Sequence, residues 1–531
     1  MEDAQSPLAA ISGDKCAEHP ENIPYTLTIP LLVALAAAAS DDERRSYPMD
    51  HSQPDQETVR QHTTNERLER VLDALAALCV SRPRKQAIAI GVQITATNLI
   101  ITIADNQPVE DDTIDHLKNV WATLQQLSNA YARQNDTHMG RSPNPPRSTI
   151  AADLKLKLAA QVYEFTSGKN MRQWAKLWDP IDGTGLLAFF RTVRAKKGPR
   201  LYGMTGQFEF MVVKMSIALK AMRCGDDANW KQVVGYMGDA TDIADSLLDD
   251  RDWCESLAVE LMALSPRDRE IGLMAGGLLR QSPAPPMTDS APQPATKPFA
   301  LRRHIENLTA HHRYFRALHA SAHSRTLRPA FTLAMSVEPV AVSTKTPARD
   351  ITIPTSAESW ANVLQHLSER HNLTLNQACA NPLIAHLVNK HDHNAPVAYS
   401  VHPECALITY YDSQRTLSNT YTPPLPYIGT SKPPCNPCQL WFDKYNSRPG
   451  GPKFGTRGGS SRWYFPWSPP FVSGWDHALE DALQNTCVAR LRQYGVLTGD
   501  AYPNAETKWE DDDVERGERT RQAKLMMLEG I

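Results

Sequence analysis

The chain has 531 residues and a formal net charge of −3, with 41% hydrophobic and 22% charged residues. This length suffices for two to four domains that each bury a core, and the near-neutral charge argues against a protein-wide basic field for nucleic acids. The nine cysteines are odd in number and scattered, which argues against a secreted disulfide framework and indicates a reducing compartment.

Residues 1–64 are predicted to be largely disordered, because they are polar and rich in Pro, Asp and Gln. The exception is the apolar run Ile29–Ala39, which is too short for a membrane span and indicates a buried or partner-seeking helix ending at Ser40–Glu43. The acidic N-terminus is not typical of a signal peptide. We therefore expect an intracellular protein, cytoplasmic or nuclear, with no signal peptide and no transmembrane segment.

A mostly helical domain is predicted over residues 65–280. Its first helix has Asn65 as candidate N-cap and an apolar stripe from Leu68 to Cys79. Residues 86–104 are rich in Ile, Val and Thr, which predicts a β-hairpin. Apolar residues at helical spacing predict further helices over 112–133, 150–166, 170–178, 207–222, 228–248 and 252–263.

Residues 281–299 are proline-rich and are predicted to be a linker. The stretch 301–324 that follows carries five histidines interspersed with Arg. Because they follow no metal-ligand spacing, we expect a solvent-facing helix there rather than a metal site. Residues 329–342 are predicted to form a strand, and 357–371 a helix.

Two short motifs carry the chemistry of the chain: His402-Pro403-Glu404, and Pro434-Cys435-Asn-Pro-Cys438 after a predicted strand over 425–430. One imidazole and two thiolates can hold Zn²⁺ and leave a fourth position for a water, whose pKa the metal lowers. The glutamate of the first motif does not ligate the metal but carries protons. An H-x-E motif followed by P-C-x-x-C is typical of zinc-dependent nucleobase deaminases.

Both motifs are predicted to lie at helix N-termini. Residues two apart on a regular helix point about 200° away from each other, so His402 and Glu404 converge only if His402 precedes the first turn. Pro403 favours this placement, because proline is favoured at the first helical position. Cys435 and Cys438 would lie one turn apart on the same face of the second helix. Both N-termini direct partial positive charge at the thiolates.

Residues 330–498 resemble the cytidine deaminase-like superfamily, and within it an uncharacterised fungal branch related to bacterial toxin-type deaminases. The resemblance rests on Val401–Glu404, Pro426–Cys438 and Gly455–Tyr464. It departs from the family at Pro403, where a small residue such as Ala is more usual.

The fold implied by this resemblance is α+β overall. A mostly helical N-terminal region would precede a C-terminal α/β/α deaminase-like domain at 300–498, which contains a mixed five-stranded sheet. Arg462–Pro466 would be the strand after the zinc-binding helix. Asp476 is the candidate N-cap of a helix that ends at Gly495. A charged tail at 499–531 follows.

The resemblance implies that His402, Cys435 and Cys438 ligate Zn²⁺ and that Glu404 is the catalytic proton shuttle. In this hydrolytic mechanism a zinc hydroxide attacks C4 of a cytosine or C6 of an adenine, and ammonia leaves.

Ser431, Trp463 and Tyr464 are candidate substrate-binding residues, the two aromatic ones because such rings can stack on a base. The expected partner is a nucleobase-containing small molecule or a single-stranded nucleic acid, and not a membrane. A protein partner for the N-terminal helical region and assembly into a homo-oligomer are further predictions.

Two other functions stay open at the level of the sequence. A non-catalytic interaction protein could keep the deaminase fold and use zinc only to stabilise it. Alternatively, Cys435 and Cys438 could be a thiol redox pair that binds no metal. Glu404 favours the enzyme, because a purely structural zinc site has no need of a carboxylate there.

Overall fold

The computed structural model describes residues 29–43, 64–82, 86–137, 149–177, 199–222, 229–249, 301–342, 354–390, 401–417, 421–449, 451–460, 462–464, 466–470 and 476–499. The predicted linker, the helix predicted over 252–263 and residues 500–531 of the predicted tail lie outside these ranges.

The elements of the first half, in chain order, are α1 (Ile29–Glu43), α2 (Thr64–Leu78), β1 (Ile88–Ile94), β2 (Asn98–Asp105), α3 (Asp111–Thr137), α4 (Thr149–Leu177), α6 (Pro199–Met222) and α7 (Trp230–Asp249). Those of the second half are α10 (Leu301–His323), α11 (Arg328–Thr332), β3 (Ala334–Val340), α12 (Ala357–Arg370), β4 (Thr374–Leu375), α13 (Gln377–Lys390), α14 (Pro403–Leu417), β5 (Gly429–Thr430), α15 (Asn436–Asn446), α16 (Asp476–Gln493) and β6 (Leu497–Thr498).

A four-stranded mixed sheet in the order β3-β2-β1-β5 lies at the centre. The predicted hairpin is observed as the antiparallel pair of β1 and β2. β3 joins β2 in parallel, and β5 joins β1 in antiparallel register through the pairs Ala89–Thr430 and Ile90–Gly429. The sheet therefore combines strands from both sides of the predicted linker.

The expected fifth strand, Arg462–Pro466, is not a strand in its described residues, 462–464 and 466. The carbonyl of Arg462 instead accepts a hydrogen bond from the backbone N–H of Asn436, the first residue of α15, at 2.8 Å. Pro466 has no N–H to donate to a ladder. β3 occupies a sheet edge, and β4 and β6 form a separate two-stranded sheet.

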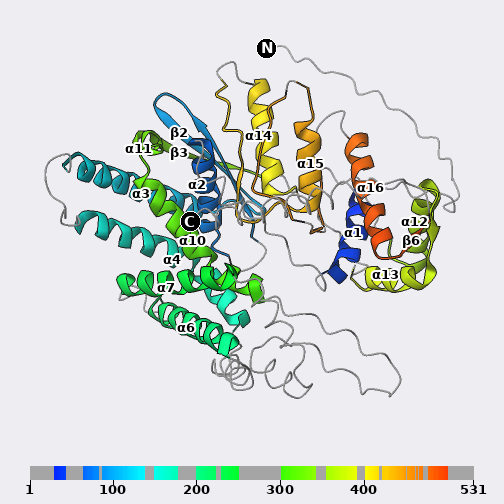
Figure 1. The fold of residues 1–531 in the computed structure, drawn as a ribbon. Helices are drawn as coiled ribbons and strands as arrows, with labels where there is room; N and C mark the ends of the chain where they lie inside the picture. Colours follow the sequence, from blue (N-terminus) through cyan, green and yellow to red (C-terminus); the bar gives the residue numbers. More distant parts are fainter. Residues whose placement is uncertain are drawn as a thin grey trace, which may run out of the picture.

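Helices cover both faces of the sheet, and each face has its own core. Ile88, Ile90 and Val92 of β1 point into a core with α2, α3, α4, α6, α7 and α10. Ala89 and Ala104 of the same hairpin belong to a second core with α1, α12, α13, α14, α15 and α16. Figure 1 shows α14 and α15 between the helical lobe around α2, α3, α4 and α10 and the group of α1, α12, α13 and α16.

Small residues on the hairpin allow the close approach of α14. A Cβ at Gly91 would collide with the Tyr411 hydroxyl on α14 and would lie 2.9 Å from its Cε2. On β5, a Cβ at Gly429 would lie 2.5 Å from the backbone carbonyl carbon of Leu72 on α2. Gly91 therefore lets α14 pack directly on the backbone of β1, and Gly429 lets α2 pack directly on the backbone of β5. This packing helps to position α14, which begins at the first motif, and β5, which precedes the second.

The N-terminal helix α1 lies within a segment that was expected to be largely disordered. Its residues 31–38 are almost completely buried, and it packs against α16 and α13. The prediction of a buried helix at this position is confirmed. The remaining described part of this segment is Thr64, the first residue of α2.

The prediction of a solvent-facing helix over residues 301–324 was wrong. The helix forms as α10, but it packs against α2, α3, α4 and α7, and His311 and His312 are each 3% exposed. Burial is tolerated because the histidines stay neutral: the pKa of His312 is lowered to about 4 by burial, and its Nδ1 hydrogen-bonds with the Tyr163 hydroxyl.

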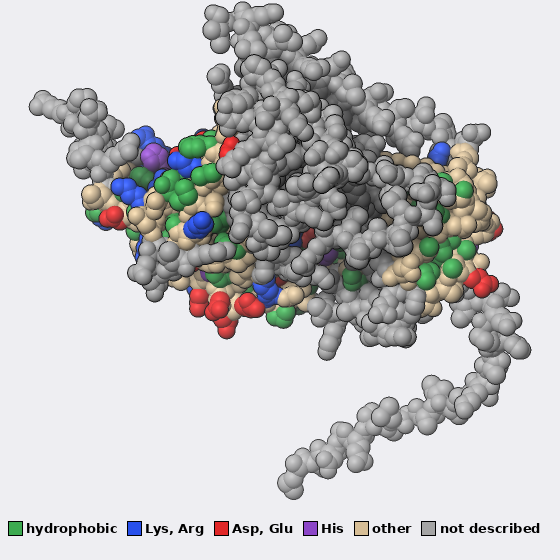
Figure 2. All heavy atoms as spheres, turned by 90° about the horizontal axis from the view of Figure 1, so that it is seen from below, with side chains coloured by type: hydrophobic (Ala, Val, Ile, Leu, Met, Phe, Trp, Pro, Cys, Tyr) green, Lys and Arg blue, Asp and Glu red, His purple; other side chains and the backbone are tan. Residues whose placement is uncertain are grey.

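Charged side chains are mixed over the described surface that Figure 2 shows, with Lys and Arg interspersed among Asp and Glu. Among the helices of the described ranges, none is long and apolar enough to cross a membrane.

Candidate metal centre

Two helix N-termini face each other at the site, as the sequence predicts. Pro403 is the first residue of α14, and the carbonyl of His402 accepts the N–H of Ala406 at 3.0 Å. Cys435 is the N-cap of α15, with extended backbone (φ −74°, ψ 165°), and its carbonyl accepts the N–H of Gln439 at 2.9 Å. Both helices thus begin with a candidate ligand and direct their partial positive charge at the site.

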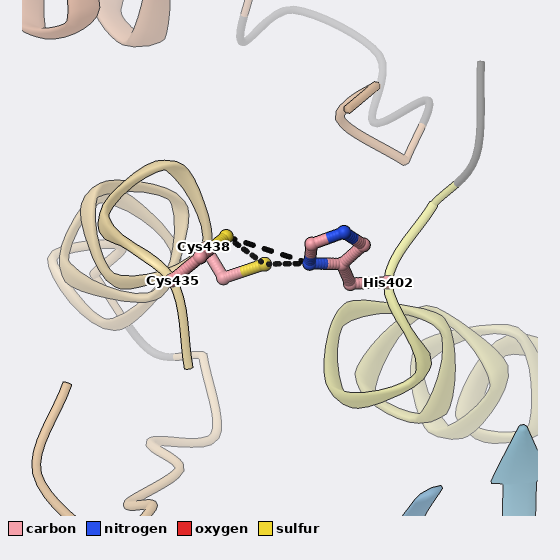
Figure 3. Close-up of side chains that lie close together, drawn as sticks. All are labelled: His402, Cys435 and Cys438. Atoms are coloured by element: carbon pink, nitrogen blue, oxygen red, sulfur yellow. Dashed lines mark hydrogen bonds between the residues drawn. The ribbon is translucent and has the colours of Figure 1, made fainter. Parts of the chain in front are cut away.

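The side chains of His402, Cys435 and Cys438 converge on one point (Figure 3). The Nδ1 of His402 lies 3.4 Å from the sulfur of Cys435 and 3.2 Å from that of Cys438, and the two sulfurs are 3.4 Å apart. A tetrahedral Zn²⁺ with Zn–S near 2.3 Å and Zn–N near 2.0 Å separates its ligand atoms by about 3.5–3.8 Å. The three atoms therefore need to move apart by only a few tenths of an ångström to fit the metal.

The three candidate ligands hold protons that a bound cation would have to replace. Burial raises the pKa of both the Cys435 and Cys438 thiols well above the usual value. Burial lowers the pKa of His402, but an ionised Cys435 beside the ring, together with Glu404, outweighs burial and raises that pKa to about 9. Burial therefore disfavours both thiolates unless a positive charge lies beside the sulfurs. A bound cation takes the place of these protons, as is general for thiolate and imidazole ligands.

Glu404, the second residue of α14, lies at the edge of the cluster. Its Oε1 is 3.9 Å from the Nδ1 of His402, and the residue is only 7% exposed. The carboxylate thus points to the same place as the three candidate ligands without being one of them. This is the convergence of His402 and Glu404 that the proline-started helix predicts.

The three predicted substrate-binding residues lie in different surroundings. Ser431 is buried, and its hydroxyl accepts the N–H of Ile88 at 2.8 Å, so it extends the pairing of β5 with β1. Trp463 is 6% exposed and belongs to the core. Tyr464 is 43% exposed, and its ring meets that of His402 edge-on with centroids 6.4 Å apart. Of the three, the structure brings Tyr464 to the site with an exposed ring.

Two contacts of Cys438 were missed at the level of the sequence. The indole Nε1–H of Trp467, a fully buried residue, donates to the sulfur of Cys438 at 3.2 Å. The thiol of Cys405, one residue beyond Glu404, is also buried and lies close enough to Cys438 to raise the pKa of that thiol. No sequence spacing links either residue to the ligand.

Residues 401–471 match the model of the OTT_1508_deam-like deaminase family. The match begins one residue before His402 and contains all three members of the cluster, Glu404 and Trp467. No curated protein and no solved structure has significant similarity to the chain.

Proposed function

We propose that this chain, whose residues 401–471 form a deaminase-like domain, is a zinc-dependent hydrolytic deaminase acting on a cytosine- or adenine-type base. The base could belong to a nucleoside, a nucleotide or a nucleic acid. The observation that carries the proposal is the buried carboxylate of Glu404 beside a three-membered His-Cys-Cys cluster inside this domain.

The chemistry of the donor set suits zinc. His402, Cys435 and Cys438 would hold the ion as one imidazole and two thiolates, a mixed N/S set that Zn²⁺ prefers. When bound, the ion supplies a Lewis acid that lowers the pKa of a water and makes a nucleophile available near neutral pH. Trp467 donates a hydrogen bond to the sulfur of Cys438 and so would hold this ligand in place.

Glu404 has the position for proton transfer. Its carboxylate would take a proton from the attacking water and deliver it to the ring nitrogen of the base, and then transfer the second proton to the leaving amino group. The balance is one water consumed and one ammonia released, with the amino group replaced by an oxo group. Tyr464, exposed beside His402, would form one wall for the base.

An open fourth position would distinguish a catalytic zinc site from a purely structural one. Structural zinc sites are closed by four protein ligands, whereas catalytic sites keep three. Within the described ranges the cluster contains three donor residues. This supports the enzyme over the interaction protein with a structural zinc.

The test combines metal content with turnover in the full chain. We expect about one zinc per chain and ammonia release from a cytosine- or adenine-containing substrate. Glu404→Gln should keep the zinc and lose turnover by roughly 10²–10⁴-fold, the usual contribution of general acid–base catalysis. Cys435→Ser should lose both. Full turnover in Glu404→Gln would contradict the proposal, and zinc binding without turnover on any base would favour the structural role.

A further inference from the structure

The strand β5, which leads into the second motif, is hydrogen-bonded along both of its edges. Toward β1, the N–H of Ser431 donates to the carbonyl of Ile88 at 2.9 Å and continues the antiparallel pairing. On the opposite edge, the N–H of Ile428 donates to the loop after α15 at 2.9 Å, and the N–H of Thr430 donates to the carboxylate of Asp73 at 2.9 Å. Since alternate N–H groups of a strand point to the same edge, Asp73 of α2 takes the place of a neighbouring strand at Thr430.

Both carboxylate oxygens of Asp73 are used in this contact. Oδ1 accepts the N–H of Thr430, and Oδ2 accepts the hydroxyl of Tyr427 at 2.7 Å. Thr430 is only 2% exposed, so without Asp73 its N–H would be buried without an acceptor, which is costly. The distance between α2 and β5 is also fixed sterically, because the backbone of Leu72 lies against Gly429 where no Cβ would fit.

A short and stiff segment joins this contact to the candidate ligand Cys435. Residues 431–434 separate Thr430 from Cys435, and the last two of them are prolines. Proline fixes its own φ and restricts the residue before it, so the segment has little freedom to absorb a displacement of Thr430. Its far end is held as well, because the carbonyl of Pro434 accepts the N–H of Ser460 at 2.7 Å. The position of Thr430 therefore determines that of Cys435.

The metal cluster depends on the exact position of Cys435. Its sulfur lies 3.4 Å from the Nδ1 of His402 and 3.4 Å from the sulfur of Cys438. Figure 3 shows that His402 and the two cysteines come from different elements of the chain. Their separation is set by how each element is held on the sheet. Metal–ligand distances tolerate deviations of only about 0.2 Å, so a small displacement of one element weakens binding.

We propose that Asp73 is a positioning residue of the metal centre. By holding Thr430 it sets where Cys435 lies relative to His402. The inference rests on the zinc site of the proposed deaminase. It gives α2, which lies far upstream of the family match at 401–471, a part in forming the site. The predicted deaminase-like domain at 300–498 leaves this helix out, so the working domain would be discontinuous in the sequence.

The affinity of the full chain for zinc, measured by competition with a chelating indicator, tests this role. Asp73→Asn keeps one acceptor oxygen and Asp73→Ala keeps none. We expect zinc affinity to fall by roughly tenfold in the first variant and further in the second, the range for groups that support a ligand. If Asp73→Ala does not fold, Asp73→Asn still decides, because it keeps the shape of the side chain. Wild-type affinity in Asp73→Asn would overturn the proposal.

The control is a second buried carboxylate of the same sheet. Asp105, 1% exposed at the end of β2, accepts the side-chain amide of Gln86 at 2.7 Å and the backbone N–H of Gln107 at 3.3 Å. Asp105→Asn should therefore lower the melting temperature as Asp73→Asn does, but bind zinc with wild-type affinity. The absorption bands of bound Co²⁺, which report its coordination geometry, should change in Asp73→Asn alone. An equal loss of zinc affinity in both variants would assign Asp73 to general stability and refute the proposal.

Turnover shows which of the two proposals fails. Zinc binding that depends on Asp73, without turnover of any base by the wild type, would refute the deaminase and keep the positioning role. Wild-type zinc affinity in the Asp73 variants, beside lost turnover in Glu404→Gln, would refute the positioning role and keep the deaminase. A wild-type chain that binds no zinc would refute both.

Discussion

The histidines of two regions of this molecule differ in their partners and in the direction of their pKa shifts. In the candidate metal centre, His402 directly precedes α14, with two sulfurs within 3.4 Å and a carboxylate at 3.9 Å. In the helical lobe, His311 and His312 are consecutive in the middle of α10, each 3% exposed. The lobe is richer in histidine, yet the metal-binding geometry found in the described residues is at the centre.

The difference lies in what each ring meets. His402 meets groups that can become anionic, so a positive charge at the site is stabilised. In the lobe, His312 and His319 meet the neutral hydroxyls of Tyr163 and Tyr131, and burial lowers the pKa of both rings to about 4. Thus the residue type alone does not make a metal site. The partners and the helix terminus decide whether the ring carries charge.

The largest difference between the two regions is expected when a candidate ligand is removed from one and a buried histidine from the other. Cys438→Ser should lose bound zinc and most of the metal's stabilisation, which is about 10–16 kcal/mol in structural zinc sites. His312→Asn should bind as much zinc per chain as the wild type, because His312 contacts Tyr163 and does not belong to the His-Cys-Cys cluster. Elemental analysis of both purified variants measures their zinc content per chain. Zinc lost in the His312 variant and kept in the Cys438 variant would reverse the assignment.

The residues of the candidate metal centre could be predicted because each of the two motifs is local in the sequence. Pro403 fixes where α14 begins, and the C-x-x-C spacing places two sulfurs one turn apart, so neither needs the rest of the fold. The end of α16 was similarly local: Gly495 has φ +67°, a conformation that glycine adopts at low cost. The hairpin followed from composition alone.

The structural features that the sequence did not predict depend on contacts between residues far apart in the chain. The fifth strand failed because the carbonyl of Arg462 is used by the N-terminus of α15. α10 is buried by helices from far away in the sequence, including α4, whose Tyr163 contacts His312, and no spacing rule anticipates this packing. The same holds for Trp467, which reaches Cys438 from 29 residues downstream. Sequence reasoning therefore found the candidate ligands and missed the surroundings that support them.

Buried histidines should make the stability of the protein depend on pH. Burial lowers the pKa of His116 and of His312 from 6.5 to about 4, so both rings are neutral in the folded state. The unfolded chain takes up these protons below pH 6.5 and the folded chain does not until pH 4. Stability is therefore full above pH 6.5 and is lost as pH falls toward 4, by several kcal/mol at about 1.4 kcal/mol per pKa unit and ring.

Denaturant unfolding at pH 7, 5.5 and 4.5 measures this loss. His312→Asn keeps an acceptor for Tyr163 but does not titrate, so its stability should fall less over the same range. The charged neighbours of His312 are Arg316, Asp242 and Lys155, which the variant leaves in place. An equal loss in wild type and variant would mean that other groups cause the acid sensitivity.

Gly429 lies where α2 of the helical lobe packs against β5, the strand that precedes the candidate ligand Cys435. Gly429→Ala places a Cβ against the backbone of Leu72, which cannot yield as a side-chain tip can. We expect a loss of about 1–3 kcal/mol in the free energy of unfolding, the usual cost of overpacking. Gly455→Ala is the matched control, since its Cβ would make an ordinary 3.5 Å contact with Tyr427. Equal stabilities of the two variants in denaturant would refute the steric argument.

The smallest expected effect belongs to Trp467→Phe. The phenyl ring retains most of the buried apolar volume and lacks the N–H that Trp467 donates to Cys438. If the indole only fills space, metal affinity should be unchanged while stability falls slightly. If it supports the ligand, zinc affinity should fall by roughly tenfold, the lower end for such supporting groups, because the sulfur loses a hydrogen bond that fixes its position.

A cobalt-substituted protein separates these cases. The sulfur-to-cobalt absorption band reports on the charge of the thiolate, and a lost N–H donor should shift it, whereas a packing defect far from the sulfur should not. Trp441→Phe is the control, since this fully buried indole lies in the same core on α15 and stacks on Tyr445. A band shift and weaker binding in Trp467→Phe but not in Trp441→Phe would show that the site extends beyond its three ligands. Identical spectra of the two variants would show that only the three candidate ligands determine the properties of the site.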